Sequence, residues 1–217
     1  MNSQQYDNAS AFPEDFRETL WHLMAVRRDV RRFRTDPVDE ALLVQCLDTI
    51  RMAPSVGLSE PWRIVRVESD LARHAALENH RQINAEALAG YAGETAEQYA
   101  KLKLSGMTEA PVHIAVFCDD GTAKGRGLGA RTMPEMRKYS VVSAVTLLWL
   151  SLRAHGLGMG WVSILDPMRL AQDLEIPSEW ALIGYFCIGW PQENTTTPEL
   201  EILGWGRRAG SLSIETR

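Results

Sequence analysis

A long apolar stretch at residues 136–155 constrains the fold of this 217-residue chain more than any other feature. Its apolar side chains recur at helical spacing with further apolar residues beside them, so a helix here would be apolar almost all round. The face with the clearest repeat comprises Val141, Ala144, Val145, Leu148, Trp149 and Leu152. Such a helix would be about 30 Å long. We therefore expect it either at the centre of the core or against a second chain.

The other periodic stretches predict an α+β protein with one sheet. Besides 136–155, helical repeats lie at residues 13–26, 39–53, 70–107 and 167–174. Stretches rich in β-forming residues lie at 63–68, 111–118, 156–164 and 181–190. These roughly five helices and four strands do not alternate strictly, which favours one sheet flanked by helices over a parallel α/β fold.

The composition is ordinary for a single enzyme-sized domain, with 45% hydrophobic and 24% charged residues. We expect a disordered lead at residues 1–12, one domain at 13–190 and a C-terminal arm at 191–217 that crosses to a partner subunit. Residues 70–108 are helical but weakly amphipathic. They would form a lid or, alternatively, a peripheral helical excursion.

The cysteines and histidines indicate which cellular compartment the protein occupies and whether disulfides or metal ions are expected. Cys46, Cys118 and Cys187 are an odd number in apolar surroundings, which favours buried core residues and a reducing cytoplasm over a disulfide framework. The histidine spacing fits no metal site. No apolar run reaches the roughly 18 residues of a membrane span. We expect neither a membrane nor nucleic acid as a partner.

Residues 26–33 read V-R-R-D-V-R-R-F in a chain whose net charge is -5. Four guanidiniums stand close together around the single carboxylate of Asp29, and they repel one another unless an anion is present. The stretch is therefore either a pocket for a phosphate or carboxylate group or a solvated helix end. A second basic pair, Arg207 and Arg208, favours the pocket.

Three glycine- or proline-rich segments add to this picture. Residues 53–62, A-P-S-V-G-L-S-E-P-W, must form a shaped loop with free backbone N–H groups. Residues 125–130, G-R-G-L-G-A, match a dinucleotide fingerprint but do not stand between a strand and a helix, so we reject that interpretation. The glycines of 156–164, G-L-G-M-G-W-V-S-I, would let a flat ring approach the backbone. Together the segments suit a planar ligand with a phosphate tail.

These motifs resemble the nitroreductase-like flavoproteins. R-R-D-V-R-R-F is similar to their R-R-S-x-R-x-F opening, and residues 53–62 are similar to their A-P-S-x-x-N-x-Q-P-W loop. The narrower resemblance is to the 5,6-dimethylbenzimidazole synthases of that superfamily. It is carried by Asp29 in place of serine and by three stretches in order: Y-A-K-L-K-L-S-G-M (99–107), T-M-P-E-M-R-K-Y-S (132–140) and G-M-G-W-V-S-I (158–164). Glu60 departs from the usual glutamine and is closer to the flavoprotein deiodinases.

The resemblance implies FMN as the cofactor and assigns residues to it. The cofactor-binding residues would be Arg27, Arg28, Arg31 and Arg207 for the phosphate and ribityl chain, and Pro54, Ser55, Gly160 and Trp161 for the isoalloxazine ring. It also implies a central mixed sheet and an intertwined homodimer with FMN at the interface.

The resemblance assigns the chemistry to Asp29 and Ser163. The carboxylate would accept a proton near the ribityl carbon that is lost, and the hydroxyl would orient the reacting ring. We expect the neighbouring arginines to keep Asp29 ionised and hence a weak base. Alternatively, Asp29 only neutralises those arginines, and Ser163 is a strand-edge hydroxyl without a chemical role.

The implied reaction is the oxygen-dependent fragmentation of reduced FMN to 5,6-dimethylbenzimidazole, the lower ligand of cobalamin. Reduced FMN and O2 would be the substrates, and a separate flavin reductase would supply the reduced flavin. Two alternatives remain open at this point. One is an NAD(P)H-dependent nitroreductase or FMN reductase that leaves FMN intact, and the other is a flavin-binding protein without catalysis.

Overall fold

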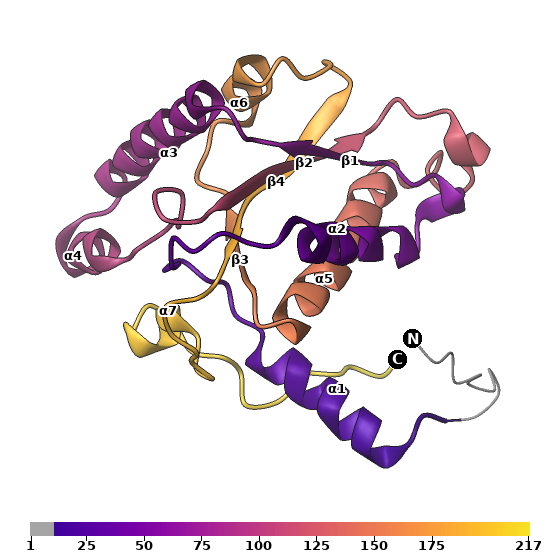
Figure 1. The fold of residues 1–217 in the computed structure, drawn as a ribbon, viewed down its shortest axis with the longest axis horizontal. Coiled ribbons are helices and arrows are strands. Elements are labelled where there is room, and N and C mark those ends of the chain that lie inside the picture. The colour runs from indigo at the N-terminus through magenta and orange to yellow at the C-terminus, as the bar shows by residue number, and fades with distance from the viewer. Residues whose placement is uncertain (1–10) are drawn as a thin grey trace.

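The computed structural model describes residues 11–217, so most of the predicted 1–12 lead lies outside the described residues. The fold is α+β, as predicted, with one sheet in the order β1-β2-β4-β3 (Figure 1). The strands are β1 Trp62–Arg66, β2 Val112–Asp119, β3 Gly158–Val162 and β4 Trp180–Gly189. The helices are α1 Glu14–Val26, α2 Glu40–Asp48, α3 Asp70–Ala89, α4 Gly93–Lys101, α5 Met136–Ala154, α6 Pro167–Asp173 and α7 Glu199–Ile202.

The prediction of a mixed sheet was wrong for these four strands. All three pairings, β1 with β2, β2 with β4 and β3 with β4, are antiparallel. Within residues 11–217, parallel pairing occurs only at an isolated bridge between Asp29 and Met159, outside the named strands. Strand direction depends on the path of long connections, which local periodicity does not record.

Apolar side chains cover both faces of the sheet, so the domain has three layers (Figure 1). Successive residues of a strand point to opposite faces. Ile114 and Val116 of β2 therefore join a cluster with α2 and α5, whereas Ala115 and Phe117 join a second cluster that includes Leu170 of α6. The predicted buried cysteines are confirmed, because Cys46, Cys118 and Cys187 all lie in these clusters and are free.

The long helix α5 has one face in the core and one face open. Ser140, Val141, Ala144, Val145, Leu148 and Leu152 are buried. On the other side, Tyr139 and Val142 are 53% and 37% exposed. The helix ends as predicted, because His155 is its C-cap and Gly156 follows in the left-handed conformation with a φ of 81°. The sequence predicted this helix either at the centre of the core or against a second chain. One side of the helix lies in the core of its own chain.

Helix α1 stands apart from the sheet (Figure 1). It has no buried residue, although Phe16, Leu20, Trp21 and Met24 give it an apolar surface. The C-terminal segment runs beside it in Figure 1. Within residues 11–217, no helix has the length and apolar character needed to cross a membrane.

A buried histidine ties β2 to β4 and makes stability depend on pH. His113 is 2% exposed, its Nδ1 accepts from the Tyr185 hydroxyl at 2.7 Å, and its Nε2 donates to the Ala110 carbonyl at 3.1 Å. Burial, with a smaller contribution from Arg73, lowers the pKa of His113 from 6.5 to about 4. The His113 ring is therefore neutral in the folded state. As the pH falls, the unfolded chain binds a proton at this residue before the folded protein does.

We expect the stabilisation from neutral His113 to be complete above pH 7 and to be lost as the pH falls from about 6.5 to 4. The loss should reach roughly 3 kcal/mol of unfolding free energy. It is measured by urea denaturation as the difference between wild type and His113→Gln, which cannot titrate. His74→Gln on the exposed side of α3 is the control. A difference that stays constant from pH 7.5 to 4 would contradict the assignment.

Candidate functional site

The arginine stretch follows α1 as an extended segment that crosses the edge strand β3. The backbone N–H of Val30 donates to the Met159 carbonyl at 3.1 Å. A Cβ on Gly160 would lie 2.1 Å from the Val30 carbonyl oxygen, and one on Gly158 would lie 2.7 Å from the Val30 side chain. These glycines therefore make room for the chain itself. The prediction that they let a flat ring approach was wrong at this face, because Val30 fills the space.

This crossing fixes Asp29 against the sheet. Its Oδ1 accepts from the Trp161 backbone N–H at 2.8 Å, and its Oδ2 accepts from Arg31 Nε at 3.0 Å and pairs with Arg31 Nη2 at 3.0 Å. Burial raises the pKa of Asp29, and this outweighs the opposing effects of Arg31, the Trp161 amide and Arg27. The arginines favour the ionised carboxylate, as expected, but burial outweighs them, so the pKa of Asp29 lies above its usual value although 32% of its side chain remains accessible.

Arg27 and Arg28 lie beside Asp29 with unsatisfied donor capacity. The Arg27 guanidinium stacks 4.4 Å above the Trp149 ring, and Arg28 Nη1 donates to the Arg27 carbonyl at 2.6 Å. Arg28 Nε is buried without a hydrogen-bond partner in the described part of the chain. Burial, followed by the repulsion of Arg208, lowers the pKa of both side chains. An anion here would satisfy the buried donor and relieve the repulsion.

A pocket of about 210 Å³ opens over this stretch, between α5 and the C-terminal arm. This volume is below the roughly 300–1,000 Å³ that small-molecule sites usually enclose. Sequence analysis missed five polar lining residues, Arg153, Glu193, Asn194, Thr195 and Glu199. Arg153 donates to Asn194 at 2.8 Å. No sequence motif marks these residues, because Arg153 comes from the last turn of α5 and the others come from the returning arm.

The predicted residues Gly160, Trp161 and Ser163 lie on or just after β3. Trp161 contributes its backbone N–H to Asp29, and its indole packs on Phe186 with ring centroids 5.0 Å apart. Ser163 is exposed two residues further on, roughly 7 Å along the chain. Of the predicted basic pair, Arg208 acts electrostatically on Arg27.

Pro54 and Ser55 lie away from the arginine stretch. The next residue, Val56, donates its backbone N–H to Ser140 Oγ at 3.0 Å, which places this loop at the first turns of α5. Arg153 lines the arginine pocket from the last turn of the same helix. The 13 residues from Ser140 to Arg153 correspond to roughly 20 Å of helix. One chain therefore does not bring its own loop to its own arginines.

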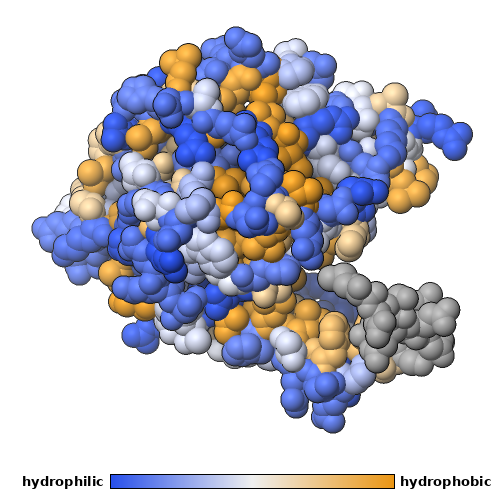
Figure 2. All heavy atoms as spheres, in the orientation of Figure 1, coloured by the Kyte–Doolittle hydropathy of each residue, from blue (hydrophilic) through white to orange (hydrophobic). Residues whose placement is uncertain are grey.

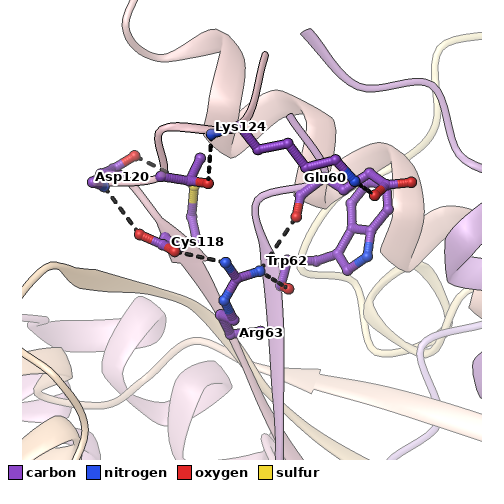
Figure 3. Close-up of polar contacts among 9 residues, drawn as sticks. Glu60, Trp62, Arg63, Cys118, Asp120 and Lys124 are labelled. Carbon is purple, nitrogen blue, oxygen red and sulfur yellow. Dashed lines mark hydrogen bonds and ion pairs between the residues drawn. The ribbon is translucent and has the colours of Figure 1, made fainter. Parts of the chain in front are cut away.

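The end of this loop is fixed to the loop after β2, as Figure 3 shows. Arg63 lies between the two loops and donates to Asp119 Oδ2 at 2.7 Å and to the Trp62 carbonyl at 2.9 Å. Lys124 reaches from the second loop and forms an ion pair with Glu60. The residue that departs from the family pattern, Glu60, is thus a structural partner of Lys124.

Backbone geometry shows that the same loop is tightly constrained. Leu58 and Glu60 have φ values of 55° and 43°, a region that costs energy for residues other than glycine. A Cβ on Gly125 would lie 2.5 Å from the Gly57 carbonyl oxygen, so the G-R-G-L-G-A segment packs directly on the loop. That segment includes a 3-10 helix at Lys124–Gly127, and rejecting the dinucleotide fingerprint was correct.

The fold and these motifs define a protein of the nitroreductase family. The chain belongs to this family, whose model matches residues 24–190. A crystal structure of oxidized iodotyrosine deiodinase bound to FMN and 3-iodo-L-tyrosine superposes with a TM-score of 0.69 and 22% identity, over 91% of this chain and 97% of that one. At this identity the likeness concerns the fold alone.

Several curated relatives carry the name 5,6-dimethylbenzimidazole synthase. The chain is 50% identical to the protein of Rhodospirillum rubrum over 197 residues, which cover 91% of this chain and 93% of the relative. It is 43% identical to the protein of Rhodobacter capsulatus over 194 residues, which cover 89% and 94%. The predicted family and its nitroreductase-like fold are confirmed.

Replacing Ser140 tests how the loop is held. Ser140 is 5% exposed, so Ser140→Ala should leave the Val56 N–H without its partner and lower the free energy of unfolding by about 1–3 kcal/mol. Amide exchange at Val56 should also become faster. Ser143→Ala is the matched control, because the exposed Ser143 hydroxyl only donates to the Tyr139 carbonyl of the same helix. Equal stability of the two variants would show that Ser140 does not hold the loop.

Proposed function

We propose that this protein is an enzyme that uses oxygen to fragment reduced FMN, releasing 5,6-dimethylbenzimidazole, the lower ligand of cobalamin. The observation that carries the proposal is the identity with the Rhodospirillum rubrum synthase over 91% of the chain. The local geometry fits, because a partly buried carboxylate with a raised pKa, Asp29, lies next to cations suited to a phosphate.

FMN would bind through Arg27 and Arg28, whose crowded guanidiniums and unpartnered Nε suit its phosphate. Arg31 would add positive charge from the same segment, and the arm would add Arg207 or, as the electrostatics favour, Arg208. Trp161 would lie beside the isoalloxazine ring, and Gly160, whose Cβ side is occupied by Val30, would meet the ring only through its backbone. Pro54 and Ser55 would line that ring in the partner subunit.

The proposed assembly is a homodimer with the FMN sites between the subunits. The roughly 20 Å between the loop and the arginines of one chain requires a second chain to complete a site that uses both. Helix α1 and the open side of α5 supply unburied apolar surface, and Figure 2 shows apolar side chains on α1 where it stands out from the body. Such surface is typical of an interface. The 191–217 arm, which lies against its own chain here, would reach the partner subunit.

In the proposed reaction, reduced FMN supplies both the ring that becomes the product and the electrons for oxygen. Asp29 would accept a proton from the ribityl carbon next to the ring. Its raised pKa makes it a better base than a free aspartate, and its bonds to Arg31 and Trp161 hold it in place. Ser163 would orient the ring by a hydrogen bond. A separate flavin reductase in the cytoplasm would supply reduced FMN.

The phosphate site can be tested by binding. Arg27→Ala should weaken FMN binding by about 1.5–3 kcal/mol, the range for a hydrogen bond to a charged group, as measured by fluorescence titration. Arg34→Ala is the control, because Arg34 is exposed and pairs with Asp36 instead. Arg208→Ala should weaken binding more than Arg207→Ala. An unchanged dissociation constant would remove the substituted residue from the site.

The chemistry can be tested by mass analysis of the small molecules left after reduced FMN meets air in the protein. Wild type should yield 5,6-dimethylbenzimidazole. Asp29→Asn should bind reduced FMN and react with oxygen, but return oxidised FMN and peroxide with at most a trace of product, because the amide accepts no proton. Ser163→Ala should behave similarly but less completely.

Two outcomes would overturn parts of this proposal. Product formation by Asp29→Asn at the wild-type rate would reduce Asp29 to a charge-balancing residue. Wild type that returns only oxidised FMN would favour a reductase if NADPH bleaches the bound flavin, and a flavin-binding protein without catalysis if it does not.

A further inference from the structure

We propose that Arg31 is a positioning residue that orients the Asp29 carboxylate and couples it to residues 102–110, the segment that connects α4 to β2. This inference rests on the proposed function for the role of Asp29. It differs from the expectation that Arg31 serves the phosphate, and it concerns contacts within the protein itself.

The donors of Arg31 are directed to protein acceptors. Nε and Nη2 both lie 3.0 Å from Asp29 Oδ2, and Nη1 donates to the Lys103 carbonyl at 3.3 Å. The side chain is only 14% exposed. A planar guanidinium can bridge two acceptors in fixed directions, which a lysine ammonium cannot reproduce. Arg31 therefore links the carboxylate to a backbone carbonyl 72 residues further along the chain.

The segment that Arg31 reaches is itself packed onto the arginine stretch. A Cβ on Gly106 would lie 2.3 Å from the Phe33 ring, and Phe33 is fully buried. Lys103 also forms an ion pair with Glu109 across the turn of this segment. Residues 102–110 therefore cannot move far without disturbing Phe33, two residues beyond Arg31.

The segment also connects the carboxylate to the predicted lid and to the arm. Tyr99 of α4 donates its hydroxyl to Asn84 of α3 at 2.9 Å, and its ring meets Trp205 of the arm with centroids 6.0 Å apart. Lys103 itself lies within the predicted lid, two residues after the end of α4 at Lys101. A displacement of the lid would thus reach Asp29 through Lys103 and Arg31.

The charges around Asp29 make the proposal measurable. Arg31 and Arg27 face it from its own segment, and the Cys187 thiol faces it from β4. The Arg31 charge opposes the effect of burial, so its removal should leave Asp29 to take up its proton at higher pH. A role limited to packing would not move this titration.

The test compares Arg31→Met, Arg31→Lys and the matched control Arg32→Met. Arg32 lies in the same stretch but is exposed and pairs with Glu199. In the flavin-free protein labelled with 13C-aspartate, we expect the Asp29 titration midpoint to rise in Arg31→Met and to stay at the wild-type value in Arg32→Met. Amide exchange across residues 103–109 should become faster in Arg31→Met alone.

Supplied with reduced FMN, Arg31→Met should lose about 10- to 100-fold in the rate of product formation, the scale for a misplaced catalytic group. Arg31→Lys should bring the Asp29 titration midpoint part of the way back to the wild-type value but restore little of the rate of product formation. This variant replaces Arg31→Met in the test if Arg31→Met does not fold. An unchanged Asp29 midpoint together with lost FMN binding would overturn the proposal and make Arg31 a cofactor ligand. A raised Asp29 midpoint in Arg31→Met, together with no product from wild type, would contradict the proposed function and leave the positioning role of Arg31 intact.

Discussion

The crossing of the extended segment 27–33 over β3 is the constraint on which the rest of the site depends. Val30 can lie on the edge strand only because Gly158 and Gly160 carry no side chain. Phe33, at the end of the crossing, is fully buried and pairs across an isolated bridge with Pro191 at the start of the arm. The segment is therefore held at Asp29 and Val30 and again at Phe33, so Asp29, Arg31 and Arg32 take fixed positions relative to the sheet.

The length of α5 is a second constraint, and it acts on assembly. The helix holds the 53–62 loop at one end through Ser140 and lines the arginine pocket at the other end through Arg153. A rigid helix keeps the loop and the arginines apart at any side-chain conformation. In the proposed function, a site that uses both would therefore draw the loop from one chain and the arginines from another.

The sequence allowed most of the fold to be predicted, because apolar periodicity and capping residues are local. Asp39 caps α2 by accepting from Leu42, and Gly156 follows the end of α5, so both helices begin or end at the limits of the predicted stretches. The predictions that failed concern contacts between residues far apart in the sequence and the burial that results from them. The group that fills the space over Gly160 comes from Val30, and the direction of the Asp29 pKa shift is set by burial, which outweighs the neighbouring charges. The prediction that the arm crosses to a partner stays a prediction.

The charges in the arginine stretch explain why it needs an anion. Arg31 is neutralised by Asp29, and Arg32 is neutralised by Glu199 of the arm. No carboxylate of residues 11–217 forms an ion pair with Arg27 or Arg28, and Arg208 adds a further positive charge that lowers the pKa of both. Unpaired, partly buried cations are costly, and a phosphate dianion would balance two of them. Because Asp29 is bound to Arg31, it cannot serve this purpose, and it remains separate from the phosphate site as a carboxylate whose proton affinity burial has raised.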